Sequence, residues 1–467
     1  MLLFAALLCL APLFASAEEE EVAIDWTDQC AIEAGEETEH AAWLFDDKVN
    51  TCLELERRGK LTVSWGEYIP AKKLCLEWHT PTDGVVVRFL DDAGRLLSET
   101  TLVRGAANVI PLAEKARSAQ IVATKGMQLS ELRLYGKGIL PEKYHEWRET
   151  PDHIDYLLVA THPDDDVLYL GSVVPIYGAE RGYVGTIAYV TCQTRERMTE
   201  AENGAWAMGL RCRPLFLDFP DIGPRASAAR RRQLSYDDLL LSIVRTYRAY
   251  RPLVVFAQDK NGEYGHWQHV LSSRAAVEAF ALAADPTYDP DTVQTDGVWQ
   301  VQKIYLHLYK ENELRLDADT PLSAFNGQDA FTVAKNAFLK HRTQQGYSFA
   351  VERNEGKYPF NRFGMALGAV EAGDDAFSNI DETLFSFYVP PTPAPTDTPA
   401  PTDTPAPTDT PAPTDAATPR PTKEAKQSAW MGSALKWLWA VILGVTVPVV
   451  LYGIAQNRRR GKETDDA

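Results

Sequence analysis

Two segments of the sequence place histidines close to carboxylates. The stretch LLVATHPDDDVLYLGS (residues 157–172) turns from an apolar run to one histidine, His162, and three consecutive aspartates. The stretch AQDKNGEYGHWQH (residues 257–269) follows another apolar run and ends with His266 and His269, whose side chains would share one face at the start of a helix. Crowded carboxylates raise one another's pKa, and a divalent cation removes that electrostatic cost. The two segments therefore indicate a metal site, provided that the fold brings them together.

Apolar strands and helical segments alternate over residues 154–388. This alternation predicts an α/β fold, a Rossmann-like and mostly parallel sheet with helices on both faces. Ligands of such sheets bind beyond the carboxyl ends of the strands. If the first and fourth strands are neighbours, the histidines and aspartates of both segments converge on one cavity. The expected strands are YLLVA (156–160), VGTIAYVT (184–191), PLFLDF (214–219) and PLVVFA (252–257), and the expected helices lie near 166–180, 196–210, 227–250 and 267–284.

The residue types favour zinc as the metal. Imidazole and carboxylate ligands with an open position are typical of catalytic zinc, whereas magnesium and calcium prefer oxygen ligands. Each segment alone also has a structural explanation. HPDDD could be a helix N-cap with aspartates that favour the helix dipole, and an isolated His-x-x-His pair commonly has no ligand role. Their joint position at the ends of two strands of one sheet favours the metal site.

At these residues the chain resembles a known family, the zinc-dependent N-acetylglucosaminyl deacetylases of the PIG-L/LmbE type. ATHPDDD resembles the Ala-His-Pro-Asp-Asp-Glu motif of the family, and DKNGEYGHWQH resembles its Tyr-Gly-His-x-x-His segment. The chain departs from the family at Asp166, where glutamate is usual, and at Trp267 and Gln268, which replace Pro-Asp. These departures bear on substrate choice and on the groups around the ligands. Weaker similarities are RMTEAENGAWAMG (197–209), LDFPD (217–221) and KNAFLKHRTQ (335–344), so that the resemblance covers roughly residues 154–346.

The resemblance implies a role for each matched residue. His162, Asp165 and His269 would ligate zinc. Asp164 would be the general base that takes a proton from the attacking water. Adjacent carboxylates in a turn do not easily reach the same face of one cation, which agrees with giving the ligand role and the base role to two neighbouring aspartates.

Four further residues are assigned to the reaction by the resemblance. Tyr264 would stabilise the oxyanion, and His266, in its protonated form, would support that charge or deliver a proton to the leaving amine. Arg197 and Asp221 would contact sugar hydroxyls. Both also have a structural explanation, as a helix-surface salt bridge and a turn aspartate. Two other histidines are expected to be structural: His307 in the alternating segment IYLHLY, and His341 in the late helix.

Residues 22–138 are rich in short alternating strands separated by turn signals such as TPTDG and DDAG, which predicts a β-sandwich of the jelly-roll type. AAWLFDDKVNTCLEL and LSELRLYGKG resemble segments of discoidin-like, galactose-binding-like modules, which often bind carbohydrate. This domain either binds glycan or supports the catalytic domain. Accordingly, Trp43, Trp65 and Trp78 either stack on sugars or belong to the core. The cysteines outside the leader, an odd number that permits at most two disulfides of undetermined pairing, are Cys30, Cys52, Cys75, Cys192 and Cys212.

Both ends of the chain carry targeting signals. Residues 1–17 contain an apolar run followed by Ala-Ser-Ala and are expected to be a signal peptide, although the missing basic residues leave an uncleaved anchor as an alternative. Residues 389–429 form a Pro/Thr-rich disordered linker, a spacer or an O-glycosylation platform. Residues 435–455 are expected to be one transmembrane helix, and the basic residues of 456–467 place that tail in the cytoplasm. The domains are then extracellular, on what we expect to be a bacterial cell surface.

Taken together, these observations predict a zinc-dependent hydrolase that removes acetyl from an N-acetylated amino sugar outside the cell. The net charge of −18 argues against a nucleic-acid partner. The expected substrate is a GlcNAc-type glycan or glycoconjugate. The alternatives are a zinc amidase for a non-sugar or lipid-linked amide, and an inactive glycan-binding surface protein.

Overall fold

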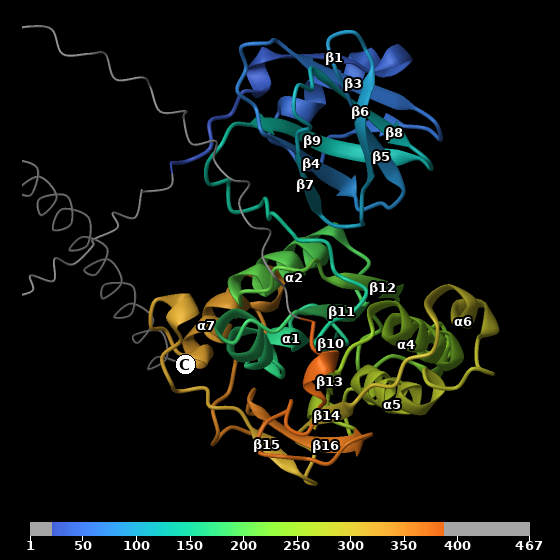
Figure 1. Cartoon of the computed structure of the whole chain (residues 1–467), viewed down its shortest axis with the longest axis vertical. Coiled ribbons are helices and arrows are strands. Elements are labelled where there is room, and N and C mark those ends of the chain that lie inside the picture. The colour runs from blue at the N-terminus through green and yellow to red at the C-terminus, as the bar shows by residue number, and fades with distance from the viewer. Residues whose placement is uncertain (1–20, 387–467) are drawn as a thin grey trace, which may run out of the picture. The chain divides into compact units, whose positions relative to one another are not determined.

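The computed structural model describes residues 21–386, apart from the side chains of residues 35–39 (Figure 1). These residues belong to one compact unit. The expected signal peptide (1–17), linker (389–429), transmembrane helix (435–455) and tail (456–467) lie outside the described residues. Between residues 21 and 386, the structure contains no helix long and apolar enough to cross a membrane.

The N-terminal part is a sandwich of two antiparallel sheets, as the sequence predicts. One sheet has the strand order β1-β3-β8-β5-β6 and the other β2-β9-β4-β7. Alternate residues of β3 point inward, so that Leu61 and Val63 are fully buried in the core between the sheets. The strands are β1 Cys30–Glu33, β2 Leu53–Leu55, β3 Lys60–Trp65, β4 Lys73–Thr80, β5 Val85–Leu90, β6 Leu96–Thr101, β7 Ala107–Pro111, β8 Ser118–Ala123 and β9 Met127–Tyr135, preceded or interrupted by the 3-10 segments η1 Thr27–Gln29 and η2 Gly35–Phe45.

The tryptophans of this sandwich serve mainly as core residues. Trp65 and Trp78 are buried, and the indole N–H of Trp78 donates to Asn108 Oδ1 at 2.7 Å. Trp43 is 38% exposed and stacks on the ring of His40. Only Trp43 of the three is therefore available to a ligand. The five cysteines of the described residues are all free thiols.

The C-terminal part is built on a seven-stranded sheet of order β12-β11-β10-β13-β14-β16-β15. The first five of these strands are parallel, while β16 runs antiparallel to β14 and β15. The mostly parallel sheet is thus confirmed, and so is the adjacency of β10 and β13, the first and fourth strands. The strands are β10 Tyr156–Ala160, β11 Gly185–Thr191, β12 Leu215–Phe219, β13 Val254–Ala257, β14 Lys303–His307, β15 Glu313–Arg315 and β16 Arg362–Gly368.

Helices cover both faces of this sheet (Figure 1). Leu158 and Ala160 of β10 pack into the core that contains residues of α1, α2 and α7, whereas Leu157 and Val159 pack into the core beneath α4 and α5. This alternation explains why every residue of β10 is apolar and buried. The helices are α1 Asp165–Leu168, α2 Arg195–Ala207, α3 Ala228–Arg231, α4 Tyr236–Tyr250, α5 Trp267–Leu282, α6 Pro290–Asp296 and α7 Ala330–Phe338, with short turns η3 Val174–Glu180, η4 Glu263–Gly265, η5 Ser323–Phe325, η6 Arg342–Gln344 and η7 Glu382–Leu384.

Two of the expected helices are broken. The helix expected near 166–180 is the single turn α1 followed by the π-helical segment η3, because Pro175 has no N–H and clashes with an α-helical continuation. The helix expected over 227–250 is divided into α3 and α4, since the Ser235 side chain caps a new N-terminus by accepting from the Asp238 N–H. The late helix α7 ends at Phe338, so His341 lies beyond it.

Candidate metal centre

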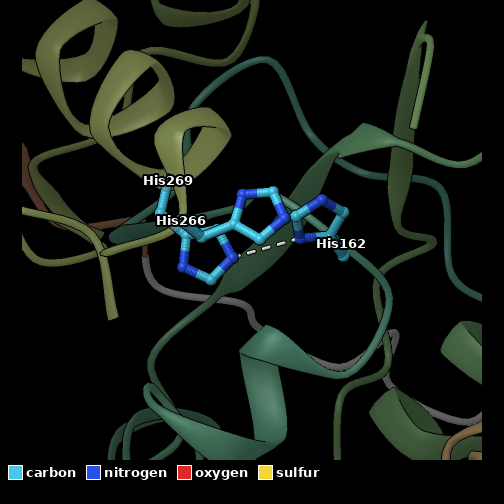
Figure 2. A group of neighbouring side chains, drawn as sticks. All are labelled: His162, His266 and His269. Atoms are coloured by element: carbon cyan, nitrogen blue, oxygen red, sulfur yellow. Dashed lines mark hydrogen bonds between the residues drawn. The ribbon is translucent and has the colours of Figure 1, made fainter. Parts of the chain in front are cut away.

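The two chemistry-bearing segments meet at the carboxyl edge of the sheet. Because β10 and β13 are parallel neighbours, the loops that follow them begin side by side, and the Thr161 N–H donates to Gln258 Oε1 at 3.0 Å. His162 comes from the loop after β10, while His266 and His269 come from the start of α5. Figure 2 shows the three imidazoles facing one another.

His162, Asp165 and His269 present three atoms to a common point. His162 Nδ1 lies 3.0 Å from Asp165 Oδ2 and 3.1 Å from His269 Nε2, and the last two atoms are 3.3 Å apart. All three side chains are buried. Atoms that share one zinc ion at bond lengths of about 2.0–2.2 Å stand roughly 3 Å apart or a little more. The three predicted ligands thus have the separations that one shared ion requires.

The three atoms, His162 Nδ1, Asp165 Oδ2 and His269 Nε2, form a triangle, and the positions of the ring protons show that all three are acceptors. His269 Nδ1 faces Glu263 Oε2 at 2.8 Å and donates to it, which leaves Nε2 as a lone pair. His162 Nε2 faces Gln268 Oε1 at 3.3 Å, which leaves Nδ1 as a lone pair. With the Asp165 carboxylate, three acceptors face one another, and a cation or an added proton must stand between them. Burial lowers the pKa of His162, but the facing Asp165 carboxylate outweighs it and raises the pKa to about 9. The donor set therefore fits a divalent cation.

His266 offers a second ligand set, formed by the three histidines with ligand atoms within 4.8 Å of one another. Its ring stacks on that of His269, with centroids 4.6 Å apart. His266 Nδ1 accepts from the Gln268 N–H at 3.2 Å, so the neutral ring carries its proton on Nε2. Burial, together with the nearby His162 and His269, lowers the pKa of His266 to about 3. The structure thus corrects the expectation of a protonated His266: it favours the neutral ring.

Asp164 lies beside the triangle but belongs to neither ligand set. It is buried, and its Oδ1 accepts from Arg197 Nη2 at 3.0 Å. Its backbone has φ of 129°, a value that favours glycine and that indicates strain held in place by the surrounding contacts. Burial and the adjacent Asp165 charge raise the pKa of Asp164 well above its usual range, opposed by Arg197. A carboxyl group with a raised pKa is suited to accepting and returning a proton.

Arg197 ties helix α2 to the loop that carries Asp164. Besides Asp164, its guanidinium donates to the Pro163 carbonyl, and its Nη1 donates to Glu200 Oε2 at 2.8 Å. Thr194 caps α2 by accepting from the Arg197 N–H at 3.3 Å. The salt bridge expected from the sequence is therefore present, and it connects α2 to the Asp164 loop. A contact of Arg197 with substrate remains a prediction.

Tyr264 and Asp221 lie where the site is open to solvent. Tyr264 is 42% exposed, and its ring centroid lies 5.4 Å from that of His269. Its backbone also has a positive φ, 45°, and its N–H donates to Tyr358 Oη at 2.9 Å. The exposed Asp221 carboxylate lies 3.7 Å from His162 Nε2. A contact of Asp221 with the sugar is still a prediction, but the side chain is within reach of a ligand at the ion site.

The sequence did not indicate that three further residues contact the ligand histidines or support them from behind. Gln268 accepts from the Ile222 N–H and donates to the Pro220 carbonyl, which fixes the amide so that its oxygen faces His162. Glu263 and His307 form a buried pair behind His269. His307 ends the strand next to β13, at the carboxyl edge where ligand-binding groups gather, and this position could have indicated its role. His341 is buried close to Gly204 and lies outside both ligand sets described above.

The family comparison agrees with this fold and site. Residues 157–280 match the family described as PIG-L: GlcNAc-PI de-N-acetylase. The chain therefore contains a PIG-L domain, which includes both chemistry-bearing segments.

Curated relatives match the same part of the chain. A 1D-myo-inositol 2-acetamido-2-deoxy-alpha-D-glucopyranoside deacetylase of Catenulispora acidiphila is 30% identical over 190 residues, which cover 34% of this chain and 57% of the relative. An enzyme of the same name from Frankia alni is 26% identical over 292 residues, covering 49% of this chain and 99% of the relative. The chain thus spans less than two thirds of the length of the Catenulispora relative.

Solved structures resemble both parts of the chain at low similarity. The N,N'-diacetylchitobiose deacetylase of Pyrococcus horikoshii has a TM-score of 0.31 and 19% identity, covering 41% of this chain and 70% of that structure. A mutant of the lectin binding domain of lectinolysin, complexed with Lewis b, has a TM-score of 0.21 and 14% identity, covering 24% of this chain and 92% of that structure. At these TM-scores neither likeness supports a conclusion about activity or binding.

Proposed function

We propose that this chain is a zinc-dependent hydrolase that removes the acetyl group from an N-acetylated amino sugar in a GlcNAc-type glycan or glycoconjugate. The observation that carries the proposal is the buried triangle of His162 Nδ1, Asp165 Oδ2 and His269 Nε2, with the Asp164 carboxyl beside it. The PIG-L domain and the deacetylase names of its relatives support the reaction and the class of sugar.

The three atoms of the triangle would hold the metal. When bound, zinc supplies a Lewis acid beside the acetamide carbonyl and makes a neighbouring water more acidic. This chemistry requires a side open to substrate, and the exposed Tyr264 and Asp221 mark that side.

Asp164 would carry the proton. Arg197 engages its Oδ1, and its Oδ2 accepts no hydrogen bond from the described residues, so this oxygen is available to the attacking water. The water oxygen bonds to the acetyl carbon and Asp164 takes a proton from it. The carbon–nitrogen bond then breaks, and Asp164 returns the proton to the departing amine nitrogen. The products are acetate and a free amino sugar.

Tyr264 and His266 would stabilise the oxyanion that forms at the carbonyl oxygen. Partial burial and the nearby Asp165 and Asp164 carboxylates raise the pKa of Tyr264, so the hydroxyl keeps its proton at neutral pH and can donate it in a hydrogen bond. The neutral His266 has an N–H at Nε2 that can donate in the same way. Such donors act on the charge that develops in the transition state.

Acetate release by the purified full-length chain tests this proposal. The substrates are N-acetylglucosamine oligomers, an inositol-linked N-acetylglucosamine and a non-sugar N-acetyl amide, each assayed before chelation, after chelation and after zinc is restored. We expect acetate from a sugar substrate, lost on chelation and recovered with zinc. Release that chelation does not affect would reject the zinc mechanism. Release from the non-sugar amide alone would identify an amidase, and glycan binding without release would identify an inactive lectin-like protein.

We also propose that the enzyme is exported and held at a membrane by residues 435–455, with its domains outside the cell. The apolar runs and the basic tail of the sequence support this arrangement. Protease added to intact cells should then remove the domains and leave the C-terminal tail protected. Protection of the domains would contradict it. Glycan binding by the β-sandwich is a separate proposal, for which Trp43 is the exposed candidate.

A further inference from the structure

A buried glutamate and a buried histidine stand behind His269, on the side of its ring that faces away from His162. Glu263 lies in the turn η4 and His307 at the end of β14, and neither is accessible to solvent. Glu263 Oε2 accepts from His269 Nδ1 at 2.8 Å, and Glu263 Oε1 lies 2.7 Å from His307 Nδ1. The proposed reaction uses neither residue.

The partners of His307 fix its protons. Its Nε2 lies 3.0 Å from the Pro359 carbonyl, which can only accept, so Nε2 carries a proton. Its Nδ1 faces a Glu263 oxygen that also accepts from the Asp259 N–H at 3.0 Å. A further proton must therefore lie between Glu263 and His307. Whichever of the two holds it, the pair is neutral overall.

This neutrality matters because both side chains are fully buried. A buried carboxylate without a compensating partner is strongly unfavourable, and removing one member of a buried pair leaves the other uncompensated. The remaining ring contacts of His307 are with Tyr169 and Phe363, with centroids at 5.6 and 6.1 Å. Neither of those rings replaces the carboxylate. His307 thus keeps Glu263 in place as an acceptor.

The Glu263–His307 pair affects the ion site through its hydrogen bond with His269. Because Oε1 is engaged by the Asp259 N–H and by His307 Nδ1, Oε2 is left to accept from His269 Nδ1, which holds the ring in one tautomer and one orientation. The lone pair is then on Nε2, the atom that faces His162 and Asp165. Hydrogen bonds of this kind orient metal ligands and raise their basicity.

We propose that Glu263 and His307 are a positioning pair that sets the affinity of the site for its divalent cation by holding the tautomer and orientation of His269. The pair links the loop after β13 to the end of β14, two strands that pair in the sheet. This inference rests on the proposed metal site at His162, Asp165 and His269.

The test is the zinc dissociation constant of the full-length chain, measured by competition with a chelating dye. Glu263→Gln should weaken zinc binding by about 10–100-fold.

Comparing His307→Gln with His307→Asn separates an effect of the hydrogen bond to Glu263 from an effect of lost packing. The amide group of asparagine takes the place of Nδ1 and can keep the hydrogen bond with Glu263, whereas that of glutamine takes the place of Nε2. We expect His307→Asn to bind zinc more tightly than His307→Gln. The double variant Glu263→Gln/His307→Gln should be no weaker than Glu263→Gln alone, because both act through one bond.

Asp155→Asn is the matched control. Asp155 is also a buried carboxylate, but it accepts from the Val184 and Ser386 N–H groups at the opposite edge of the sheet. Its variant should bind zinc as the wild type does. Equal zinc affinity in all variants, or no difference between His307→Asn and His307→Gln, would overturn the positioning role. If Glu263→Gln does not fold, the two His307 variants decide the question. A wild type that binds no zinc would instead refute the metal site itself.

Discussion

Asp164→Asn separates the proton carrier from the metal ligands. The substitution keeps the side-chain shape and the Oδ1 acceptor that Arg197 contacts at 3.0 Å, and it removes the ability to take a proton together with the negative charge of the ion pair. Positioned proton transfer contributes about 10²–10⁴-fold to a rate, and each factor of ten is about 1.4 kcal/mol. The expected loss in kcat is therefore roughly 100-fold or more, equivalent to about 3–5 kcal/mol.

The zinc content should not change, because the triangle of His162, Asp165 and His269 is intact in this variant. Asp165→Asn is the matched control: it makes the same chemical change one residue later and should lose both zinc and activity. The assays are acetate release for kcat and plasma mass spectrometry for bound zinc. If Asp164→Asn loses its zinc while Asp165→Asn keeps it, the ligand and the base have been assigned the wrong way round. Retention of more than about a tenth of kcat would place the proton acceptor elsewhere.

Further predictions concern the hydrogen bonds of Arg197 to the Asp164 loop, the pH dependence of the free energy of unfolding, and the packing of the core. Arg197→Lys cannot reach both Asp164 and Glu200, so kcat should fall about 10–100-fold at unchanged zinc content, as measured by the same two assays. His145 is buried, and burial lowers its pKa to about 4, so the folded state loses up to roughly 3 kcal/mol of stability as the pH falls from about 6.5 to 4. Urea unfolding at several pH values should show this slope, and His145→Gln should flatten it; an unchanged slope would assign it to other groups. Phe256→Ala, in the centre of the sheet, should cost about 3–5 kcal/mol in the same assay, and a cost below about 1 kcal/mol would contradict the packing described.

The sequence predicts the sheet and the meeting of the two loops because both follow from strong local patterns. The uninterrupted apolar strands at 156–160 and 252–257 indicate a sheet buried on both faces, and parallel connections place their ends at one edge. It follows that His162, Asp165 and His269 could be proposed as neighbours without a structure. Their separations of 3.0–3.3 Å depend on side-chain packing that no local pattern encodes.

The groups behind the ligands are beyond such patterns. His307 lies in an alternating strand and resembles a core residue, and Glu263 lies in a polar loop and resembles a surface residue. They pair because β13 and β14 are adjacent, which is a long-range property of the sheet. Likewise, the neutral state of His266 depends on the Gln268 N–H and on burial, neither of which the spacing of the histidines reveals. The broken helix after Asp165 could have been anticipated, since Pro175 is visible in the sequence.

The proposed function depends most on which three atoms hold the cation. Anomalous diffraction at the zinc edge from crystals of the zinc-loaded protein measures this directly. We predict one peak at about 2.0–2.2 Å from each of His162 Nδ1, Asp165 Oδ2 and His269 Nε2, with the Asp164 carboxylate outside bonding distance. A peak bound by His162, His266 and His269 without Asp165, or no peak at this edge of the sheet, would contradict it.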